Sequence, residues 1–204
     1  MTNISCILLA AGESKRMGKP KLLLNLGNSN VINITINNYL KSEIFEIIVV
    51  LGNEAKKIED SISAQDKRIK FVVNKNYREG MSTSIKSGVL AASKQSEAFL
   101  IALGDQPLIS HKIIFRLIDR YLSSNAGIVT VMHQSIRGHP VIISKKYLQE
   151  ILALTGDIGA RDLLKQHLDD TASIKIESDE EFLDIDKIQD YDKLKKIYEH
   201  RLSK

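Results

Sequence analysis

The residues best suited to chemistry gather in a short basic loop near the start of the chain. Residues 8–21 read LLAAGESKRMGKPK, in which an apolar run ends at Gly12 and four basic residues follow within seven positions. Glycine lets backbone N–H groups approach phosphate oxygens closely. Arg16 adds a guanidinium fork and Lys21 a point charge, and both groups bind phosphate. The loop therefore predicts a phosphate site.

Two familiar phosphate motifs are excluded by the spacing. The P-loop of NTPases has four residues between its first glycine and a Gly-Lys pair, which Ser or Thr follows. Here five residues separate Gly12 from Gly18, and Pro20 follows Lys19. The dinucleotide fingerprint G-x-G-x-x-G does not occur in the sequence either. A solvated basic turn is the alternative, and the apolar run that precedes the glycine favours the phosphate site.

Three aspartates are candidates for holding a metal ion beside that phosphate. Asp105 follows the apolar run AFLIAL and Gly104, while Asp184 and Asp186 alternate with an isoleucine in an apolar stretch predicted to be extended. In an extended chain, alternate side chains face the same side. Mg²⁺ prefers one or two carboxylates together with phosphate oxygens and water, so the aspartates predict a magnesium site. The alternatives are turn capping by Asp105 and an ordinary acidic loop at 177–186.

Three further stretches carry polar residues typical of ligand sites. Residues 76–88, NYREGMSTSIKSG, place hydroxyl groups at a helix start, which suits an anion, a base edge or ordinary capping. In RGHPV, residues 137–141, we expect His139 to be a hydrogen-bonding residue of an irregular loop, because no G-x-S-x-G sequence accompanies it. In TGDIGARDLL, residues 155–164, Arg161 lies just inside a helix, where it binds an anion or forms a surface ion pair.

The spacing of apolar residues predicts the elements that position these loops. The predicted strands are 5–10, 46–51, 69–73, 98–103, 128–132, 140–143 and 173–176, and the predicted helices are 31–40, 54–62, 82–93, 111–122, 145–154, 160–168 and 190–202. Alternation of helices with nearly all-apolar strands predicts an α/β fold, with three layers around a mostly parallel sheet, in a single domain spanning residues 1–204. Ligands in such sheets bind beyond the carboxyl ends of strands, so the loops after residues 10 and 103 are expected at one edge.

Composition narrows the class of partner. The formal net charge of the 204 residues is +4, which is too small to indicate nucleic acid, and the chain has no Trp and few other aromatic residues on which bases could stack. No apolar run approaches the roughly 18 residues of a membrane helix, and the first residues lack the pattern of a signal peptide. We therefore expect a cytoplasmic protein that acts on small anionic molecules. Cys6, the single cysteine, is expected to be a buried thiol.

The quoted motifs also resemble those of a known family. The opening loop resembles the signature L-A-A-G-x-S-x-R-M-G-x-x-K of nucleotidyltransferases, and GDQP at 104–107 resembles their second motif. REGMSTSIKSG, RGHPV and GDIGAR are similar to the molybdenum cofactor cytidylyltransferase branch of the MobA-like NTP transferases. The resemblance extends from Ile7 to about Leu194 and implies a Rossmann-like nucleotidyltransferase fold with a mixed sheet. It implies transfer of CMP from CTP to the phosphate of molybdenum-bearing molybdopterin, with Mg²⁺ as cofactor and pyrophosphate as leaving group.

The resemblance implies a role for each matching residue. Catalytic roles are implied for Arg16, Lys21 and Asp105, and metal binding for Asp105, Asp184 and Asp186. Nucleotide contacts are implied for Leu9, Ala10, Ala11, Gly12, Ser14, Arg16, Lys21, Gly80, Ser84, Gly104 and Asp105. Acceptor contacts are implied for Gln106, Pro107, His139, Asp157 and Arg161.

Two details bear on the base and on the end of the chain. The related guanylyltransferases usually have Gly where this chain has Ala11, and the added methyl group favours cytosine over guanine. The family often reads D-I-D-T-P-E-D near its end, but here Thr-Pro does not follow Asp186. The carboxylates are kept, whereas the chain that follows them differs from the family pattern.

Several alternatives stay open from the sequence. Guanylyl transfer to molybdopterin and cytidylyl transfer to a sugar or polyol phosphate are the nearest, because they use the same chemistry. A molybdopterin-binding accessory protein for a molybdenum hydroxylase is a non-enzymatic alternative, which the metal site disfavours because a carrier needs no Mg²⁺. The expected partners are small-molecule substrates, with a molybdenum hydroxylase or its chaperone as a candidate recipient, and neither nucleic acid nor membrane.

Overall fold

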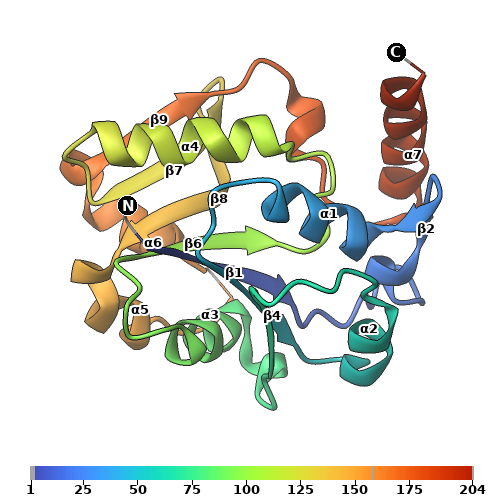
Figure 1. Cartoon of the computed structure of the whole chain (residues 1–204), viewed down its shortest axis with the longest axis horizontal. Helices are drawn as coiled ribbons and strands as arrows, with labels where there is room; N and C mark the ends of the chain where they lie inside the picture. Colours follow the sequence, from blue (N-terminus) through green and yellow to red (C-terminus); the bar gives the residue numbers. More distant parts are fainter. Residues whose placement is uncertain (1–2, 158, 204) are drawn as a thin grey trace.

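A seven-stranded sheet forms the centre of the protein (Figure 1), whose computed structural model describes residues 3–157 and 159–203. Strand β8 pairs antiparallel with β6 and β7, whereas the other pairs in the sheet are parallel. The predicted α/β class and the mostly parallel, mixed sheet are therefore confirmed. Across the sheet the strands follow the order β5 (Ile69–Val73), β4 (Glu46–Leu51), β1 (Ile4–Ala10), β6 (Ala98–Leu103), β8 (Ile136–Ser144), β7 (Ile128–His133) and β9 (Thr171–Lys175).

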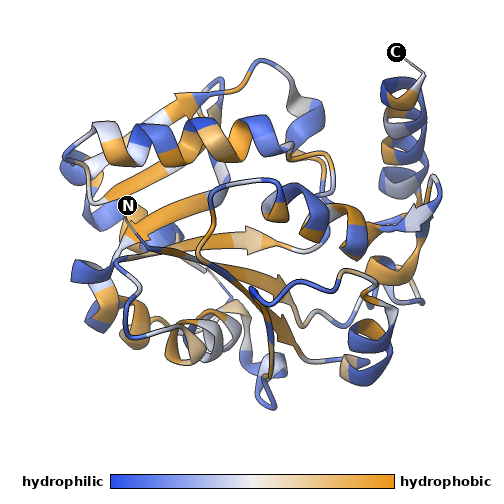
Figure 2. Cartoon of the chain, in the orientation of Figure 1, coloured by the Kyte–Doolittle hydropathy of each residue, from blue (hydrophilic) through white to orange (hydrophobic). Residues whose placement is uncertain are grey.

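Helices cover both faces of the sheet, as the alternating pattern predicts (Figure 1). Successive strand residues point to opposite faces, so Cys6 and Leu8 of β1 lie in one core cluster and Ile7 lies in the other. In Figure 2 the strands are accordingly hydrophobic, while the outer faces of the helices are hydrophilic. The first cluster includes residues of α1 (Val31–Leu40), α2 (Ala55–Ser61), α4 (His111–Ser123) and α7 (Ile188–Leu202), and the second includes residues of α3 (Met81–Ala91), α5 (Leu148–Ala153) and α6 (Arg161–Gln166).

Close packing of α3 against the sheet depends on a glycine inside the helix. A Cβ atom at Gly88 would lie 2.2 Å from Cγ2 of Ile7 and 2.9 Å from Cγ2 of Val50. Glycine in a helix interior costs about 1 kcal/mol relative to alanine, and here the close approach of helix and sheet explains why glycine occupies position 88.

Among the described helices none combines the length and the apolar character needed to cross a membrane.

Residues 137–139 lie in a strand, so their prediction as an irregular loop is wrong, whereas the strand predicted at 140–143 is confirmed. β8 begins at Ile136 and forms a hairpin with β7. The pairing shifts by a bulge, because Thr130 faces Val141 whereas Val131 faces Gly138. This shift leaves His139 and Pro140 without ladder partners on β7, and a bulge is where a sheet tolerates the missing N–H of proline. The bulge interrupts the apolar alternation that would have revealed a strand.

The segment that carries Asp184 and Asp186, which is predicted to be an extended apolar stretch, pairs with no strand of the sheet in the described part of the chain. A short 3-10 helix, η5 (Asp179–Phe182), precedes it, and the chain is irregular from Leu183 to Lys187. Ile185 is fully buried, so its apolar side chain fixes the segment against the core without sheet pairing. The sequence analysis also missed a small hairpin before α1, which is formed by β2 (Asn25–Leu26) and β3 (Ser29–Asn30).

Candidate active site

The strands that precede the two unusual loops end side by side. Leu9 of β1 lies opposite Leu103 of β6 in parallel register, and the N–H of Gly104 donates to the carbonyl of Leu9 at 2.9 Å. Thr35 of α1 donates its hydroxyl to the carbonyl of Gly104 at 3.0 Å. The loops after β1 and β6 are therefore held at the same edge of the sheet, as expected.

Three carboxylates gather at this edge. One oxygen atom each from Asp105, Asp184 and Asp186 lies within 4.8 Å of the others. Burial raises the pKa of Asp184, and the negative charges of Asp105 and Asp186 raise it further. Like charges at such distances repel, so this cluster gains stability from a cation. We call these three side chains the carboxylate cluster.

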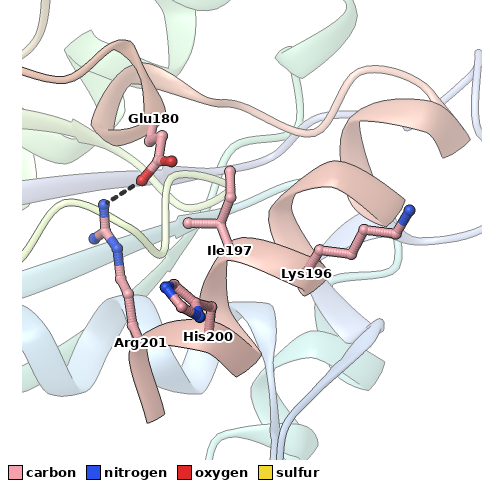
Figure 3. A pocket seen from close by; sticks show the side chains of 5 residues that line it. All are labelled: Glu180, Lys196, Ile197, His200 and Arg201. Atoms are coloured by element: carbon pink, nitrogen blue, oxygen red, sulfur yellow. Dashed lines mark hydrogen bonds and ion pairs between the residues drawn. The ribbon is translucent and has the colours of Figure 1, made fainter. Parts of the chain in front are cut away.

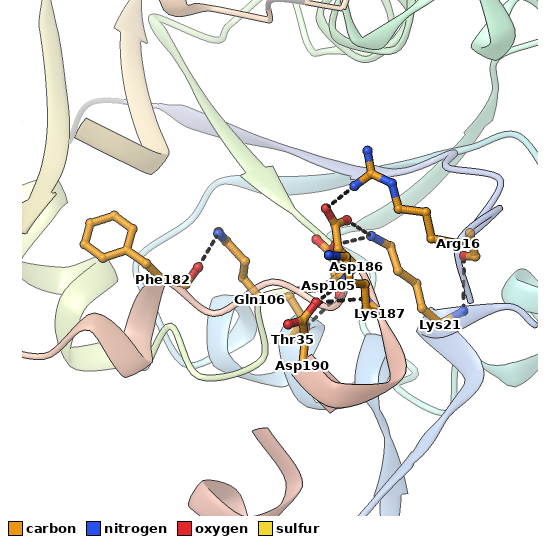
Figure 4. A network of polar contacts seen from close by, with 11 residues as sticks. Arg16, Lys21, Thr35, Asp105, Gln106, Phe182, Asp186, Lys187 and Asp190 are labelled. Atoms are coloured by element: carbon orange, nitrogen blue, oxygen red, sulfur yellow. Dashed lines mark hydrogen bonds and ion pairs between the residues drawn. The ribbon is translucent and has the colours of Figure 1, made fainter. Parts of the chain in front are cut away.

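Two basic residues of the opening loop contact the carboxylate cluster (Figure 4). Nζ of Lys21 lies 2.5 Å from Oδ2 of Asp105 and 3.6 Å from Oδ1 of Asp186. A guanidinium nitrogen of Arg16 lies 2.7 Å from Oδ2 of Asp186. Burial alone would lower the pKa of Lys21, but the nearby carboxylates outweigh burial and raise it, so its ammonium group stays charged. The structure thus joins the predicted phosphate loop to the predicted metal ligands.

The backbone of the opening loop is itself held in an unusual conformation. Ser14 has a φ angle of 52°, and its hydroxyl accepts a hydrogen bond from the backbone N–H of Lys21 at 3.2 Å. A Cβ atom at Gly12 would meet nothing within 4 Å, so open space lies beside this part of the loop. Gly18 also has a positive φ angle, 64°, where glycine is favoured. A ligand could therefore enter the space beside Gly12.

The donor set of the carboxylate cluster fits a hard divalent cation. Mg²⁺ takes oxygen ligands and is commonly held by one or two carboxylates, with substrate phosphate completing its shell. Asp105 is nearly buried, and Asp186 is half-exposed and already paired with Arg16. The cluster therefore meets the chemical requirement for Mg²⁺, and Asp105 is its least exposed member, whereas Asp184 is exposed.

The predicted base-binding residues come from the end of β1 and the start of α3. Ala10 and Ala11 are buried at the end of β1, and a Cβ atom at Gly52, just after β4, would lie 2.8 Å from Cβ of Ala11. Ser84 is also buried, and its hydroxyl accepts a hydrogen bond from the side-chain amide of Asn74 at 3.0 Å. The hydroxyl group of Ser84 thus has a protein partner.

The start of α3 is not an open anion site, contrary to one sequence-based interpretation. The carboxylate of Asp157 accepts a hydrogen bond from the N–H of Met81 at 3.0 Å, and the carbonyl of Gly156 accepts one from Ser82 at 3.1 Å. A Cβ atom at Gly80 would lie 2.4 Å from the carbonyl oxygen of Gly156. Gly80 therefore permits the close contact between the two loops, and Asp157 caps the helix.

The other predicted acceptor residues occupy different local settings. The side-chain amide of Gln106 donates to the carbonyl of Phe182 at 3.4 Å, and the carbonyl of Pro107 accepts from Asn38 at 3.0 Å. The ring of His139 hydrogen-bonds the carbonyl of Ile101 at 3.3 Å, which agrees with its predicted hydrogen-bonding character. Burial lowers the pKa of His139. Arg161 begins α6 and is exposed.

Two open hollows lie away from the carboxylate cluster. One, of about 450 Å³, lies between η5 and α7, and there Arg201 bonds to Glu180 (Figure 3). The other, of about 480 Å³, lies at the hairpin of β2 and β3 and is lined by uncharged polar residues. Neither hollow includes a residue of the carboxylate cluster.

Several residues that organise this site were not identified from the sequence. Thr35 fixes the loop at Gly104, and Asp190 accepts hydrogen bonds from the N–H groups of Asp186 and Lys187 at 3.1 and 2.8 Å. Phe182 receives the amide of Gln106. Only the helix-start pattern around Asp190 could have signalled such a role, because the other contacts join segments far apart in the sequence.

Comparisons with known proteins agree with this geometry. The sequence pattern of the MobA-like NTP transferase domain matches residues 6–171, which include Lys21 and Asp105. The chain is 32% identical over 198 residues to the molybdenum cofactor cytidylyltransferase of Escherichia coli (strain K12), covering 97% of this chain and 98% of the relative. It is 32% identical over 178 residues to nicotine blue oxidoreductase of Paenarthrobacter nicotinovorans, covering 81% of this chain and 84% of the relative.

A solved structure of a nucleotidyl transferase has a similar fold. A nucleotidyl transferase from Methanothermobacter superposes with a TM-score of 0.84 at 26% identity, covering 98% of this chain and all of that one. The family pattern spans well over half of the 204 residues. The chain therefore belongs to the MobA-like NTP transferase family and is a nucleotidyltransferase.

Proposed function

We propose that this nucleotidyltransferase transfers CMP from CTP to the phosphate of molybdenum-bearing molybdopterin and releases pyrophosphate. The observation that carries the proposal is the 32% identity to a molybdenum cofactor cytidylyltransferase across 97% of the chain. The relative named nicotine blue oxidoreductase is equally identical but matches only 81% of the chain. The carboxylate cluster, with Lys21 in contact, supports phosphoryl chemistry on an anionic substrate.

The opening loop would bind the triphosphate of CTP. Open space lies beside Gly12, where backbone N–H groups from Ala11 to Ser14 would bind phosphate oxygens. Arg16 would contact the β- and γ-phosphates. The side chain of Arg16 is 69% exposed and is held by the single carboxylate of Asp186, so exchanging that carboxylate for phosphate costs little. Lys21 is 17% exposed, and its charge would stabilise the α-phosphate as negative charge develops there.

The carboxylate cluster would hold Mg²⁺ through Asp105 and Asp184, with Asp186 as an additional ligand. A bound Mg²⁺ supplies positive charge against the triphosphate. The positive charge on Lys21 does not depend on a metal, because the surrounding carboxylates raise its pKa. Lys21 therefore contributes charge stabilisation in addition to that of the cation.

The reaction itself needs no nucleophile from the protein. An oxygen of the molybdopterin phosphate, already an anion, forms a bond to the α-phosphorus of CTP. The bond between that phosphorus and the bridging oxygen of pyrophosphate breaks, and pyrophosphate leaves with the electron pair. The role of the chain is to position the two phosphates in line and to neutralise their charge.

The base and the acceptor would lie on either side of the triphosphate. Ala10, Ala11, Gly80 and Ser84 would contact cytosine, and the methyl group of Ala11 disfavours a purine in its place. The acceptor would meet residues beyond β6 and around β8 and α6: Gln106, Pro107, His139, Asp157 and Arg161. We propose a molybdenum hydroxylase or its chaperone as recipient of the product, and the cytoplasm as the place of reaction.

Mass spectrometry of the product tests the proposal. The protein is incubated with molybdenum-bearing molybdopterin, Mg²⁺ and an equimolar mixture of CTP, GTP, UTP and ATP. We expect a cytosine dinucleotide of the cofactor together with pyrophosphate. A guanine dinucleotide would contradict the assignment of the base, and the lack of any dinucleotide would contradict the assignment of the acceptor.

Two matched variants control this experiment. Asp105→Asn keeps the size of a buried side chain in the carboxylate cluster and is expected to reduce the product by about 10²-fold. Asp119→Asn makes the same chemical change on the exposed face of α4 and is expected to leave the product unchanged. Equal product from both variants would show that the carboxylate cluster is not the reaction site.

A further inference from the structure

The segment from Phe182 to Asp186, which we call the carboxylate segment, delivers two carboxylates to the site without sheet pairing. Its conformation must therefore be fixed by side-chain contacts. The side chain of Ile185 is fully buried and anchors the segment between its two aspartates. A second anchor lies at its beginning, where the ring of Phe182 rests on the sheet over β8.

The ring of Phe182 can pack in this position only because residue 138 has no side chain. A Cβ atom at Gly138 would lie 2.3 Å from Cε1 and 2.6 Å from Cδ1 of the Phe182 ring. Real Cβ atoms do not approach other atoms this closely, so any side chain at 138 displaces the ring. The φ angle of Gly138 is not among the positive ones, so the backbone does not itself require glycine there. The ring is the reason for glycine at this position.

A hydrogen bond joins this anchor to the third carboxylate. The amide of Gln106 donates to the carbonyl of Phe182 at 3.4 Å, and Gln106 directly follows Asp105 (Figure 4). Gln106 is 6% exposed, so its amide has little access to water in place of this partner. Asp184 lies two residues after Phe182, and Asp105 directly precedes Gln106. We therefore expect a movement of Phe182 to change the distance between the carboxylates of Asp105 and Asp184.

We propose that Gly138 is a positioning residue for the divalent-cation site, acting through the ring of Phe182 and the amide of Gln106. Gly138 contributes no ligand. It sets how closely the carboxylate segment approaches the sheet, and thereby how the oxygens of Asp184 and Asp186 meet those of Asp105. The proposal rests on the metal site of the proposed function, but its test uses neither nucleotide nor molybdopterin.

The test measures the affinity of the purified protein for Mn²⁺. The electron paramagnetic resonance signal of free Mn²⁺ reports how much of the ion stays unbound. Gly138→Ala is expected to weaken Mn²⁺ binding by about 10-fold or more, because groups that orient metal ligands have effects of that size. Phe182→Leu, which removes the ring but keeps an apolar side chain, is expected to weaken Mn²⁺ binding much less than Gly138→Ala does. The double variant Gly138→Ala/Phe182→Leu is expected to recover most of the lost affinity, because the added methyl group then has room.

A second glycine provides the matched control. A Cβ atom at Gly127 would be crowded to the same degree, 2.3 Å from an oxygen of Asp170 and 2.3 Å from Cε of Lys146. Gly127 lies at the opposite end of the sheet, since its carbonyl accepts from Ser144, which pairs with the first residue of β6. Gly127→Ala is therefore expected to leave Mn²⁺ affinity unchanged even if it lowers the stability of the protein.

Three outcomes would overturn the proposal: wild-type affinity in Gly138→Ala, failure of the double variant to recover affinity, or no Mn²⁺ binding by the wild type. If Gly138→Ala does not fold, Gln106→Leu tests the same link, and wild-type Mn²⁺ affinity in that variant overturns it. The proposed function fails separately, when Mn²⁺ binds as expected but the product carries no cytosine nucleotide.

Discussion

The central sheet carries buried carboxylates at both of its ends, in opposite surroundings. At the amino end, the carboxylate of Glu46 accepts hydrogen bonds from the hydroxyl of Ser5 at 2.7 Å, the N–H of Ser93 at 2.7 Å and the ammonium of Lys70 at 2.6 Å. At the carboxyl end, the three aspartates of the carboxylate cluster lie together, and the ammonium group of the partly buried Lys21 contacts them.

The pKa shifts of the two ends run in opposite directions. Burial would raise the pKa of Glu46, but Lys70, Ser93 and Ser5 outweigh it and lower the pKa. Burial raises the pKa of Asp184, and neighbouring carboxylates add to that effect. A network whose donors satisfy its one carboxylate stabilises the fold, whereas surplus negative charge at a sheet edge is typical of a functional site. The comparison thus separates a structural network from the site proposed for catalysis.

Substitutions at the carboxyl end of the sheet are expected to have the largest effect, and that effect is on catalysis. Lys21→Ala and Asp105→Ala should each lower the rate of CMP transfer by about 10²-fold or more, as removal of one electrostatic stabiliser does elsewhere. The rate is measured by release of pyrophosphate, with circular dichroism to verify folding. Near-normal turnover by either folded variant would remove the role assigned to that residue.

At the amino end the expected effect is on stability. Glu46→Gln should lower the free energy of unfolding by about 1–3 kcal/mol at neutral pH, because buried donors lose a charged partner. Urea denaturation measures this loss, and the transfer rate of the folded fraction should stay at the wild-type level. A loss of transfer equal to that in Asp105→Ala would contradict the structural role of Glu46.

The pH dependence of this loss follows from the lowered pKa of Glu46. The stability that ionised Glu46 contributes is fully present above the pKa of an unfolded glutamate, about 4.3. It is lost as the pH falls through the lowered pKa of the folded state. The difference in unfolding free energy between wild type and Glu46→Gln should therefore shrink in acid, and a constant difference would show that ionisation is not its source.

The contrast between the two ends was only partly visible in the sequence. The apolar strands and their terminal loops could be predicted, because β1, β4 and β6 are short apolar runs that end at or near glycine. The network at Glu46 could not, since its donors come from three separate segments that only the folded chain brings together.

Other parts of the site depended on contacts that no local pattern encodes. His139 lies in a strand because a bulge at Thr130 accommodates Pro140, and a bulge interrupts the period that predicts strands. Asp184 and Asp186 do share one side, as expected, but a buried Ile185 rather than strand pairing fixes them. The placement of Phe182 over Gly138 is a tertiary contact between distant segments.

Asp157 is a carboxylate near the carboxylate cluster for which the structure shows a capping contact. Its variants test whether it also binds the acceptor. Asp157 caps α3, so Asp157→Ala should lower the free energy of unfolding by about 1 kcal/mol. Asp157→Ser should retain most of the stability, because serine also caps helices. Thermal unfolding measures both. A selective rise of the KM for the acceptor, with unchanged stability, would instead support acceptor binding by Asp157.

The smallest expected effect is a gain in stability, in a variant of Asp184. Because the pKa of Asp184 is raised in the folded state, stability falls as the pH rises from about 3.9, the value for unfolded aspartate, through the raised value. In protein treated with a chelator, Asp184→Asn should therefore unfold at a slightly higher temperature than the wild type at neutral pH. This gain should vanish in acid, and destabilisation at neutral pH would contradict the account of surplus charge.

Transfer of label from the α-phosphate of CTP tests the central claim most directly. Wild type and Glu46→Gln, compared as folded protein with molybdopterin and Mg²⁺, should both place the label in the cofactor product, whereas Asp105→Asn should reduce it by about 10²-fold. Label transfer that survives in Asp105→Asn, or that is lost equally in Glu46→Gln, would contradict the assignment of the chemistry to the carboxyl end of the sheet.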